Sequence, residues 1–357
     1  MHLPSFMLFL AAAATGVTVG SAQKAQPLLF AATQNTDPAK GIYTYKLNTN
    51  DGSLTQWVVT PLSFATGELT TYLKEATSKK YDGKPLIHAL NRATGIGYVS
   101  AMTLNANGKL DLLNTQQMLG GSPAHITLSP NEDFVTVANY AGSLSLVPLY
   151  ENGSVAPETY YEAFPNGSRI VMDQQATGHI HSTRWLPNSN NVIAFDLGGD
   201  TLLQYELDTT KQTLKKLETV NRPPGSGPRH SVLSTSRDFL YVTDELSNTV
   251  GVYRISHPKS LLESPAIQNI TSLPKDFTST STAADIHLSK NGKFVYVSNR
   301  GHNSIAIYAI NESDGTLTSL GWESTRGLDE QTGLLAYTGN SYEIDGAVCL
   351  YVSTYLF

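Results

Sequence analysis

A strand-forming unit that recurs along the chain is the feature that most constrains its fold. Each copy has a short polar start, a turn such as Ser-Pro-Asn, a β-branched run that ends on Asn or Asp, a second turn and an alternating run. Clear copies begin at Ser122, His179, Gly227 and Ala283, and weaker ones lie around Asn91 and near Leu28. Alternating runs between Gly, Asn, Asp and Ser turns are typical of β-strands. The repeat therefore predicts an all-β protein.

The spacing of the copies indicates the architecture. The polar residue that ends the β-branched run recurs roughly every 50 positions, at Asn91, Asn139, Asp196, Asp244 and Asn299. A strand meander repeated at about this length is the signature of propeller blades. We predict one seven-bladed β-propeller domain over residues 23–357. After Trp322 the motif is missing, so we expect a divergent or incomplete last blade.

The N-terminal residues predict export. Residues 1–22 contain an apolar stretch and end on small residues, which is typical of a signal peptide cleaved near Ala22; an uncleaved signal anchor is the alternative. We expect a secreted, extracellular protein with no membrane association after cleavage. Four Asn-x-Ser/Thr sequons are candidate glycosylation sites. They lie at Asn152, Asn166, Asn269 and Asn311.

Charge and cysteine content exclude several partners. The chain has 30 acidic and 24 basic residues, a net charge of −6, and no basic run that would meet a nucleic acid backbone. One cysteine, Cys349, excludes an intrachain disulfide and a Cys-rich metal site. Nucleotide-binding motifs are absent, so we expect no cofactor. A small-molecule substrate and a monomeric state are expected.

Polar residues recur at equivalent positions of the repeats, and in a propeller such positions face one channel. The position after the strand end reads Arg92, Tyr140, Leu197, Glu245 and Arg300, and the start of the unit contributes His181 and Arg229. A histidine beside a carboxylate can transfer protons, and guanidinium groups bind carboxylates. We therefore predict four catalytic residues and four flanking substrate-binding residues. The catalytic set is His181, Glu245, Arg229 and Arg300, and the binding set is His179, His230, Arg92 and His125.

Each of these residues also has a structural interpretation. The strand-end residues Asn139, Asp196, Asp244 and Asn299 can cap turns through local hydrogen bonds. Glu245 and Arg300 can form an ion pair between blades, and the histidines can serve packing. A metal held by His179 and His181 is conceivable because they lie two residues apart. No carboxylate completes that site, so no metal is expected.

The motifs resemble a known family. The resemblance rests on five segments of this chain: Ser122-Pro123-Ala124-His125, His179-Ile180-His181-Ser182, Gly227-Pro228-Arg229-His230, the turn Asp196–Asp200, and Ser298-Asn299-Arg300. Together they resemble the lactonase family of seven-bladed propellers, which includes 6-phosphogluconolactonases and carboxy-cis,cis-muconate cyclases. The resemblance runs from about Leu28 to Trp322. It implies catalytic roles for His181, Arg229, Glu245 and Arg300.

The resemblance implies a metal-independent enzyme that forms or opens a lactone ring on a small carboxylate-bearing substrate. It would be a lactonase or a lactonizing isomerase (cyclase), and export argues against a phosphorylated sugar lactone. The alternative is an inactive secreted glycoprotein propeller that serves as a binding or surface protein. A calcium-dependent sugar lactonase is disfavoured because the channel positions are rich in Arg and His.

Overall fold

A computed structural model describes part of the chain. The described residues are 27–33, 39–61, 69–76, 81, 85–325 and 347–356. The predicted signal peptide lies outside them. The chain divides into two compact units, which are described separately. Unit 1 comprises Met1–Val135, Val147–Glu158 and Tyr337–Phe357, and unit 2 comprises Thr136–Leu146 and Thr159–Ala336.

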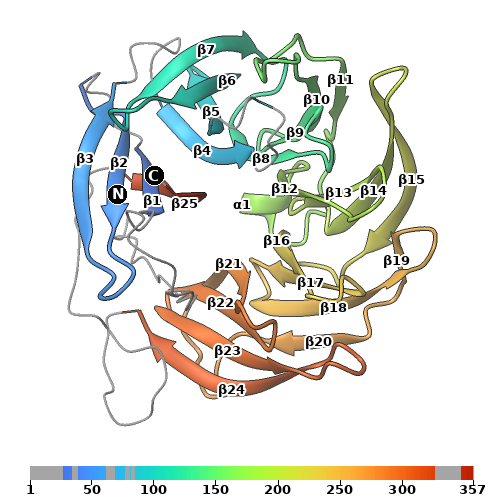
Figure 1. The fold of residues 1–357 in the computed structure, drawn as a ribbon. Coiled ribbons are helices and arrows are strands. Elements are labelled where there is room, and N and C mark those ends of the chain that lie inside the picture. The colour runs from blue at the N-terminus through green and yellow to red at the C-terminus, as the bar shows by residue number, and fades with distance from the viewer. Residues whose placement is uncertain are drawn as a thin grey trace. The chain divides into compact units, whose positions relative to one another are not determined.

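Unit 1 contains two four-stranded antiparallel sheets, ordered β25-β1-β2-β3 and β4-β5-β6-β7 (Figure 1). Its strands are β1 (Pro27–Thr33), β2 (Ile42–Leu47), β3 (Leu54–Thr60), β4 (Leu69–Ala76), β5 (Leu86–Ala93), β6 (Ile96–Leu104), β7 (Leu110–Gln117), β8 (Pro123–Leu128) and β25 (Ala347–Leu356). A buried core lies between the two sheets and includes Phe30, Ile42, Leu73, Ile87 and Met102.

Unit 2 repeats the same arrangement. Its strands pair in the orders β11-β10-β9, which is part of a four-stranded sheet, β12-β13-β14-β15, β16-β17-β18-β19 with β20 paired to β18, and β21-β22-β23-β24. The elements are β9 (Phe134–Asn139), β10 (Ser143–Pro148), β11 (Tyr160–Ala163), α1 (Met172–Gln175), β12 (Ile180–Trp185), β13 (Asn191–Asp196), β14 (Thr201–Asp208), β15 (Thr213–Asn221), β16 (Pro228–Leu233), β17 (Phe239–Asp244), β18 (Thr249–Ser256), β19 (Leu261–Leu262), β20 (Gln268–Thr271), β21 (Thr282–Leu288), β22 (Phe294–Arg300), β23 (Ser304–Ile310) and β24 (Leu317–Ser324).

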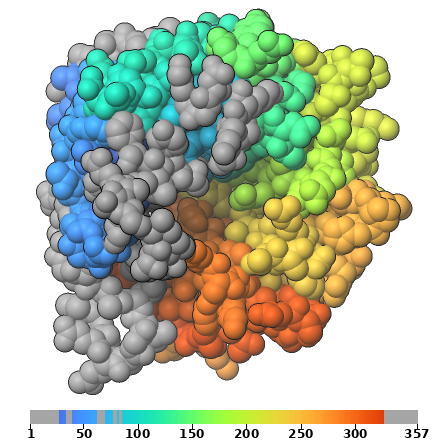
Figure 2. Space-filling view, in the orientation of Figure 1, coloured from blue at the N-terminus to red at the C-terminus, as the bar shows by residue number. Residues whose placement is uncertain are grey.

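The first strands of three successive sheets in unit 2 are neighbours. β16 contacts both β12 and β21, and the later strands of each sheet lie progressively farther from them (Figure 1). In the space-filling view, segments of successive sheets form a continuous surface coloured from green to orange (Figure 2). This arrangement brings side chains of different sheets together along β12, β16 and β21.

The second strands are buried on both faces. All six residues of β13 and of β17 are buried. In β17, Phe239 and Tyr241 enter the core shared with β21–β24, whereas Leu240 and Val242 enter the core shared with β12–β15. Successive side chains of a strand point to opposite faces, so a strand buried on both faces reads as a continuous apolar run. This explains why the repeat contains β-branched runs.

The first strands share a β-bulge at one position. The pairing register shifts between Ile180 and Ser182 in β12, between Pro228 and His230 in β16, and between Ala283 and Ile286 in β21. A bulge adds a residue to one strand and redirects its side chain. His181, Arg229 and Asp285 all lie within these bulges. The shared irregularity therefore places polar side chains at one level of three sheets.

The polar residues at the strand ends form longer-range contacts as well as turns. Asp196 Oδ1 accepts from the backbone N–H groups of His179, at 2.8 Å, and Gly199, at 2.9 Å, which is the expected turn capping. Asp244 differs, because its carboxylate is paired with the Arg222 guanidinium and accepts from the Thr249 hydroxyl. The turn-capping interpretation therefore describes Asp196 and is wrong for Asp244.

The pair Arg222–Asp244 is the centre of a buried polar network. Arg222 Nε donates to Asp244 Oδ1 at 3.0 Å, and Nη1 donates to the Tyr253 hydroxyl and to Asn269 Oδ1, each at 2.8 Å. A Cβ on Gly251 would lie 2.6 Å from Nη1, so only glycine leaves room for the guanidinium there. Removal of one partner would leave the other charge buried and unpaired.

The described residues thus form six sheets, which have the antiparallel meander of propeller blades. The divergent or incomplete last blade is expected after Trp322; in that segment residues 326–346 lie outside the described residues, and Ala347–Leu356 form β25, which pairs with β1. The four sequon residues Asn152, Asn166, Asn269 and Asn311 are all exposed, and their glycosylation stays a prediction. The described part of the chain contains no helix of the length and apolarity that a membrane span requires.

Arg222→Leu is expected to lower the free energy of unfolding by about 3–5 kcal/mol, because Asp244 would remain buried without its cation. Chemical denaturation measures this loss. Lys215→Leu on the exposed face of β15 is the control and should change stability by less than about 0.5 kcal/mol. Equal stability of the two variants would contradict the assigned role of the buried pair.

His88 predicts a pH dependence of stability. Burial lowers its pKa to about 4, although the hydrogen bond between Nε2 and the Gly153 carbonyl oxygen, at 3.1 Å, opposes the shift. The unfolded chain binds a proton at His88 near pH 6.5, whereas the folded chain stays neutral there. The contribution of neutral His88 to the free energy of unfolding is therefore fully present above about pH 6.5, and it is lost as the pH falls towards about 4.

We expect wild type to lose about 2–3 kcal/mol more than His88→Gln between about pH 7 and about pH 4.5. Glutamine retains a donor for the Gly153 carbonyl and removes the titration. Urea unfolding of both proteins at the two pH values measures the difference. Parallel pH profiles would show that His88 does not contribute.

Candidate active site

Glu245 lies at the centre of the candidate site, directly after β17. Its backbone N–H donates to the Gly227 carbonyl at 2.7 Å, and its carbonyl accepts from Ala283 N–H at 3.1 Å. These bonds fix it between β16 and β21. Its carboxylate then contacts side chains from three other strands. The position follows the strand end, as the repeat predicts.

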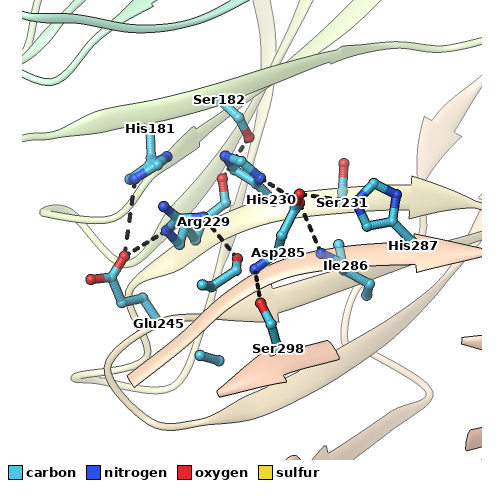
Figure 3. A network of polar contacts seen from close by, with 12 residues as sticks. His181, Ser182, Arg229, His230, Ser231, Glu245, Asp285, Ile286, His287 and Ser298 are labelled. Atoms are coloured by element: carbon cyan, nitrogen blue, oxygen red, sulfur yellow. Dashed lines mark hydrogen bonds and ion pairs between the residues drawn. The ribbon is translucent and has the colours of Figure 1, made fainter. Parts of the chain in front are cut away.

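Three predicted residues converge on the Glu245 carboxylate. Arg229 Nε donates to Oε2 at 2.8 Å, and Arg300 Nη2 pairs with Oε1 at 2.6 Å. His181 Nε2 lies 4.0 Å from Oε2 (Figure 3). That distance permits an ion pair when the imidazole is protonated but is too long for a hydrogen bond. The structure therefore brings His181, Arg229, Glu245 and Arg300 into one cluster within unit 2.

Burial differs among these groups. The side chains of His181, Arg229 and Glu245 are 11%, 16% and 11% exposed, whereas that of Arg300 is 41% exposed. Burial and the neighbouring Arg300 lower the pKa of Arg229, and Glu245 opposes that shift. The Arg229 guanidinium also donates to the Ala284 carbonyl at 2.9 Å, which fixes its orientation. Arg300 is thus the cation most open to a ligand.

Tyr140 belongs to this cluster although the sequence did not single it out. Its ring stacks on His179 with a centroid distance of 4.4 Å and meets the His181 ring edge-on at 5.7 Å. Burial and the Glu245 charge raise the pKa of Tyr140, while Arg229 and Arg300 oppose the shift. Its place in the repeat, equivalent to Glu245 and Arg300, was the available signal.

A second carboxylate cluster adjoins the first. His230 Nδ1 lies 2.8 Å from Asp285 Oδ1, and the His230 ring meets the His181 ring edge-on at 5.0 Å (Figure 3). Asp285 Oδ1 also accepts from Ile286 N–H at 2.9 Å, and Oδ2 lies 2.9 Å from His287 Nε2. Burial raises the pKa of Asp285, but the two histidines outweigh it and hold that pKa well below its usual range. Asp285 is a second residue that the sequence did not single out.

The remaining predicted binding residues are in different units. His179 and His230 lie with the cluster in unit 2. Arg92 on β5 and His125 on β8 belong to unit 1, where His125 is buried with its ring 4.6 Å from that of Tyr72. Substrate contact by Arg92 and His125 stays a prediction. Among the described residues, no group of three or more His, Cys, Asp or Glu side chains is placed to hold a metal ion.

Glu245→Gln is expected to lower the pKa of Tyr140, because the charge that opposes the phenolate is removed while Arg229 and Arg300 remain. Phenolate absorbance during alkaline titration measures the shift, and Tyr140→Phe in the same background identifies the phenol. Glu263→Gln, at an exposed carboxylate, is the control and should leave the titration unchanged. An unchanged Tyr140 titration in Glu245→Gln would contradict the cluster geometry.

Comparison with known proteins places this arrangement in a family. The model of the family described as Lactonase, 7-bladed beta-propeller matches residues 28–329. A 6-phosphogluconolactonase of Bacillus subtilis (strain 168) is 33% identical over 291 residues, which cover 81% of this chain and 79% of that protein. A 6-phosphogluconolactonase of Formosa agariphila is 33% identical over 299 residues, which cover 81% of this chain and 80% of that protein.

Solved structures agree with the sequence comparison. The periplasmic gluconolactonase of Pseudomonas aeruginosa superposes with a TM-score of 0.82 at 25% identity, covering 92% of this chain and 99% of that chain. A putative 6-phosphogluconolactonase from Bacteroides uniformis superposes with a TM-score of 0.80 at 27% identity, covering 92% and 100%. With its all-β sheets and the match over residues 28–329, this chain belongs to the lactonase family of seven-bladed β-propellers.

Proposed function

We propose that the protein hydrolyses a sugar lactone. The observation that carries the proposal is the convergence of His181, Arg229 and Arg300 on the Glu245 carboxylate within 4.0 Å. Lactone hydrolysis needs a group that moves a proton and cations that stabilise developing negative charge. Family membership and the names of the relatives, 6-phosphogluconolactonase and gluconolactonase, support this reaction class.

In this reaction His181 carries the proton. A water oxygen bonds to the lactone carbonyl carbon while His181 takes one of the water protons. The Glu245 carboxylate stabilises the resulting imidazolium through their proximity. The bond between the carbonyl carbon and the ring oxygen then breaks, and the ring oxygen receives the proton. The product is a hydroxy acid.

The two arginines have different roles in the proposal. Arg229 is buried and committed to Glu245 and the Ala284 carbonyl, so it orients the carboxylate. Arg300 is more exposed and can donate N–H groups to the substrate. A guanidinium there can hold the oxyanion of the tetrahedral intermediate or a carboxylate of the substrate. Binding and charge stabilisation would thus fall mainly to Arg300.

We propose an extracellular protein with an unphosphorylated aldonolactone as substrate. The predicted signal peptide and the four exposed sequons support export. A structural relative named as a periplasmic gluconolactonase supports an unphosphorylated sugar lactone. The relatives reported above carry lactonase names, so ring opening ranks above the closure of a carboxymuconate to a lactone.

The test is a lactone assay on purified protein with gluconolactone, 6-phosphogluconolactone and carboxymuconate. His181→Gln is expected to lower kcat for the preferred lactone by at least about 100-fold, because the proton carrier is lost. His257→Gln, at an exposed histidine paired with Asp238, is the matched control and should keep wild-type turnover.

Each other result would change the assignment. Full activity of His181→Gln would remove His181 from the mechanism. Turnover of carboxymuconate alone would make the protein a cyclase. A well-folded wild type without turnover on any of the three compounds would favour a binding or surface protein. Faster turnover of 6-phosphogluconolactone would contradict the unphosphorylated substrate.

A further inference from the structure

We propose that Asp285 is a positioning residue that holds His230 as a second proton-transfer group of the site, acting beside His181. This inference rests on the proposed lactone hydrolysis and replaces one step of it: His230, in place of His181, takes the proton of the attacking water. The His230 ring lies between Asp285 and the His181 ring (Figure 3). An imidazole oriented by a carboxylate is the arrangement by which a general base is fixed in one tautomer.

The environment of Asp285 determines the His230 tautomer. Oδ1 accepts from the Ile286 N–H at 2.9 Å, and the nearby His230 Nδ1 lies 2.8 Å from the same oxygen. An ionised carboxylate accepts hydrogen bonds and donates none. Nδ1 must therefore carry the proton, and Nε2 of a neutral His230 is an acceptor. The bulge in β21 makes this possible because it turns Asp285 towards β16.

Charged and titratable groups from several strands surround His230. They are Arg229 on its own strand, Arg184 and His181 on β12, Asp285 and His287 on β21, and Glu245 after β17. Burial and Arg229 lower the pKa of His230, and Asp285 opposes this. His181, in contrast, lies beside the Glu245 carboxylate, which stabilises an imidazolium. The two adjacent rings thus have different carboxylate partners.

Different carboxylate partners allow the two proton transfers of lactone hydrolysis to be divided between the two rings. The attacking water gives one proton to His230 Nε2 as its oxygen bonds to the carbonyl carbon. As the bond to the ring oxygen breaks, His181 gives its proton to that oxygen. The product retains the second water proton as a carboxylic acid and then ionises. Transfer of one proton from His230 to His181 restores the starting state.

The test combines the His230 tautomer with kinetics. Nitrogen NMR of labelled histidine reports which ring nitrogen bears the proton, and a His230→Gln spectrum assigns the signals. In wild type we expect the proton on Nδ1. Asp285→Ala removes the acceptor and is expected to shift the proton towards Nε2 and to lower kcat by at least about 100-fold, with a smaller change in KM.

Asp285→Asn is the conservative variant. Its amide oxygen can still accept from Ile286 N–H and from His230 Nδ1, so it should retain the wild-type tautomer and recover most of the kcat lost in Asp285→Ala. Asp238→Ala is the matched control, because it removes the carboxylate of an exposed Asp–His pair with His257. It should leave both the His230 signals and kcat unchanged.

The outcomes separate this inference from the proposed function. A proton on Nε2 of His230 in wild type, or unchanged kcat in Asp285→Ala with lactone turnover intact, would overturn the inference alone. The expected tautomers without lactone turnover in wild type would overturn the proton-transfer role together with the proposed function. The inference would also be overturned if Asp285→Asn and Asp285→Ala lost kcat equally while both kept the wild-type His230 tautomer.

Discussion

Burial of the second strands on both faces is the constraint on which the rest of unit 2 depends. β17 sends Phe239 and Tyr241 into one core and Leu240 and Val242 into the other, so each core is shared by consecutive sheets. A four-stranded sheet of this kind gains its stability from its neighbours, as in other repeat architectures. The same packing holds β12, β16 and β21 together as neighbours. Side chains from separate repeats can therefore meet on Glu245.

The site follows from two carboxylates with different partners. Glu245 is neutralised by two guanidinium groups, whereas Asp285 is bound by two histidines and a backbone N–H. Guanidinium groups keep their charge and hold the Glu245 carboxylate in place. The imidazoles that bind Asp285 can gain or lose a proton near neutral pH. The Glu245 group and the Asp285 group are in contact through the His181 and His230 rings. The chemistry proposed above depends on keeping these two environments distinct.

The repeat in the sequence predicted much of this structure. Asn139, Asp196 and Asp244 are the last residues of β9, β13 and β17, and the positions that the repeat aligned do supply the Glu245 cluster. The bulges could not be predicted, because they depend on the pairing register between strands and not on a local pattern. For the same reason the sequence did not single out Asp285. The Arg222–Asp244 pair joins a loop to a strand end, a contact that no local spacing encodes.

The pairing of β25 with β1 has a consequence for synthesis of the chain. Ala31 pairs with Leu350, and Ala32 with Cys349, so the first of the described strands completes its sheet with the last of them. Contacts between residues so distant in sequence form slowly. Until the ribosome releases the C-terminal segment, one edge of β1 lacks its native partner and is open to other strands. Chaperone binding to nascent chains should accordingly persist until residues 347–356 emerge, and a premature stop before them would leave that edge permanently uncovered.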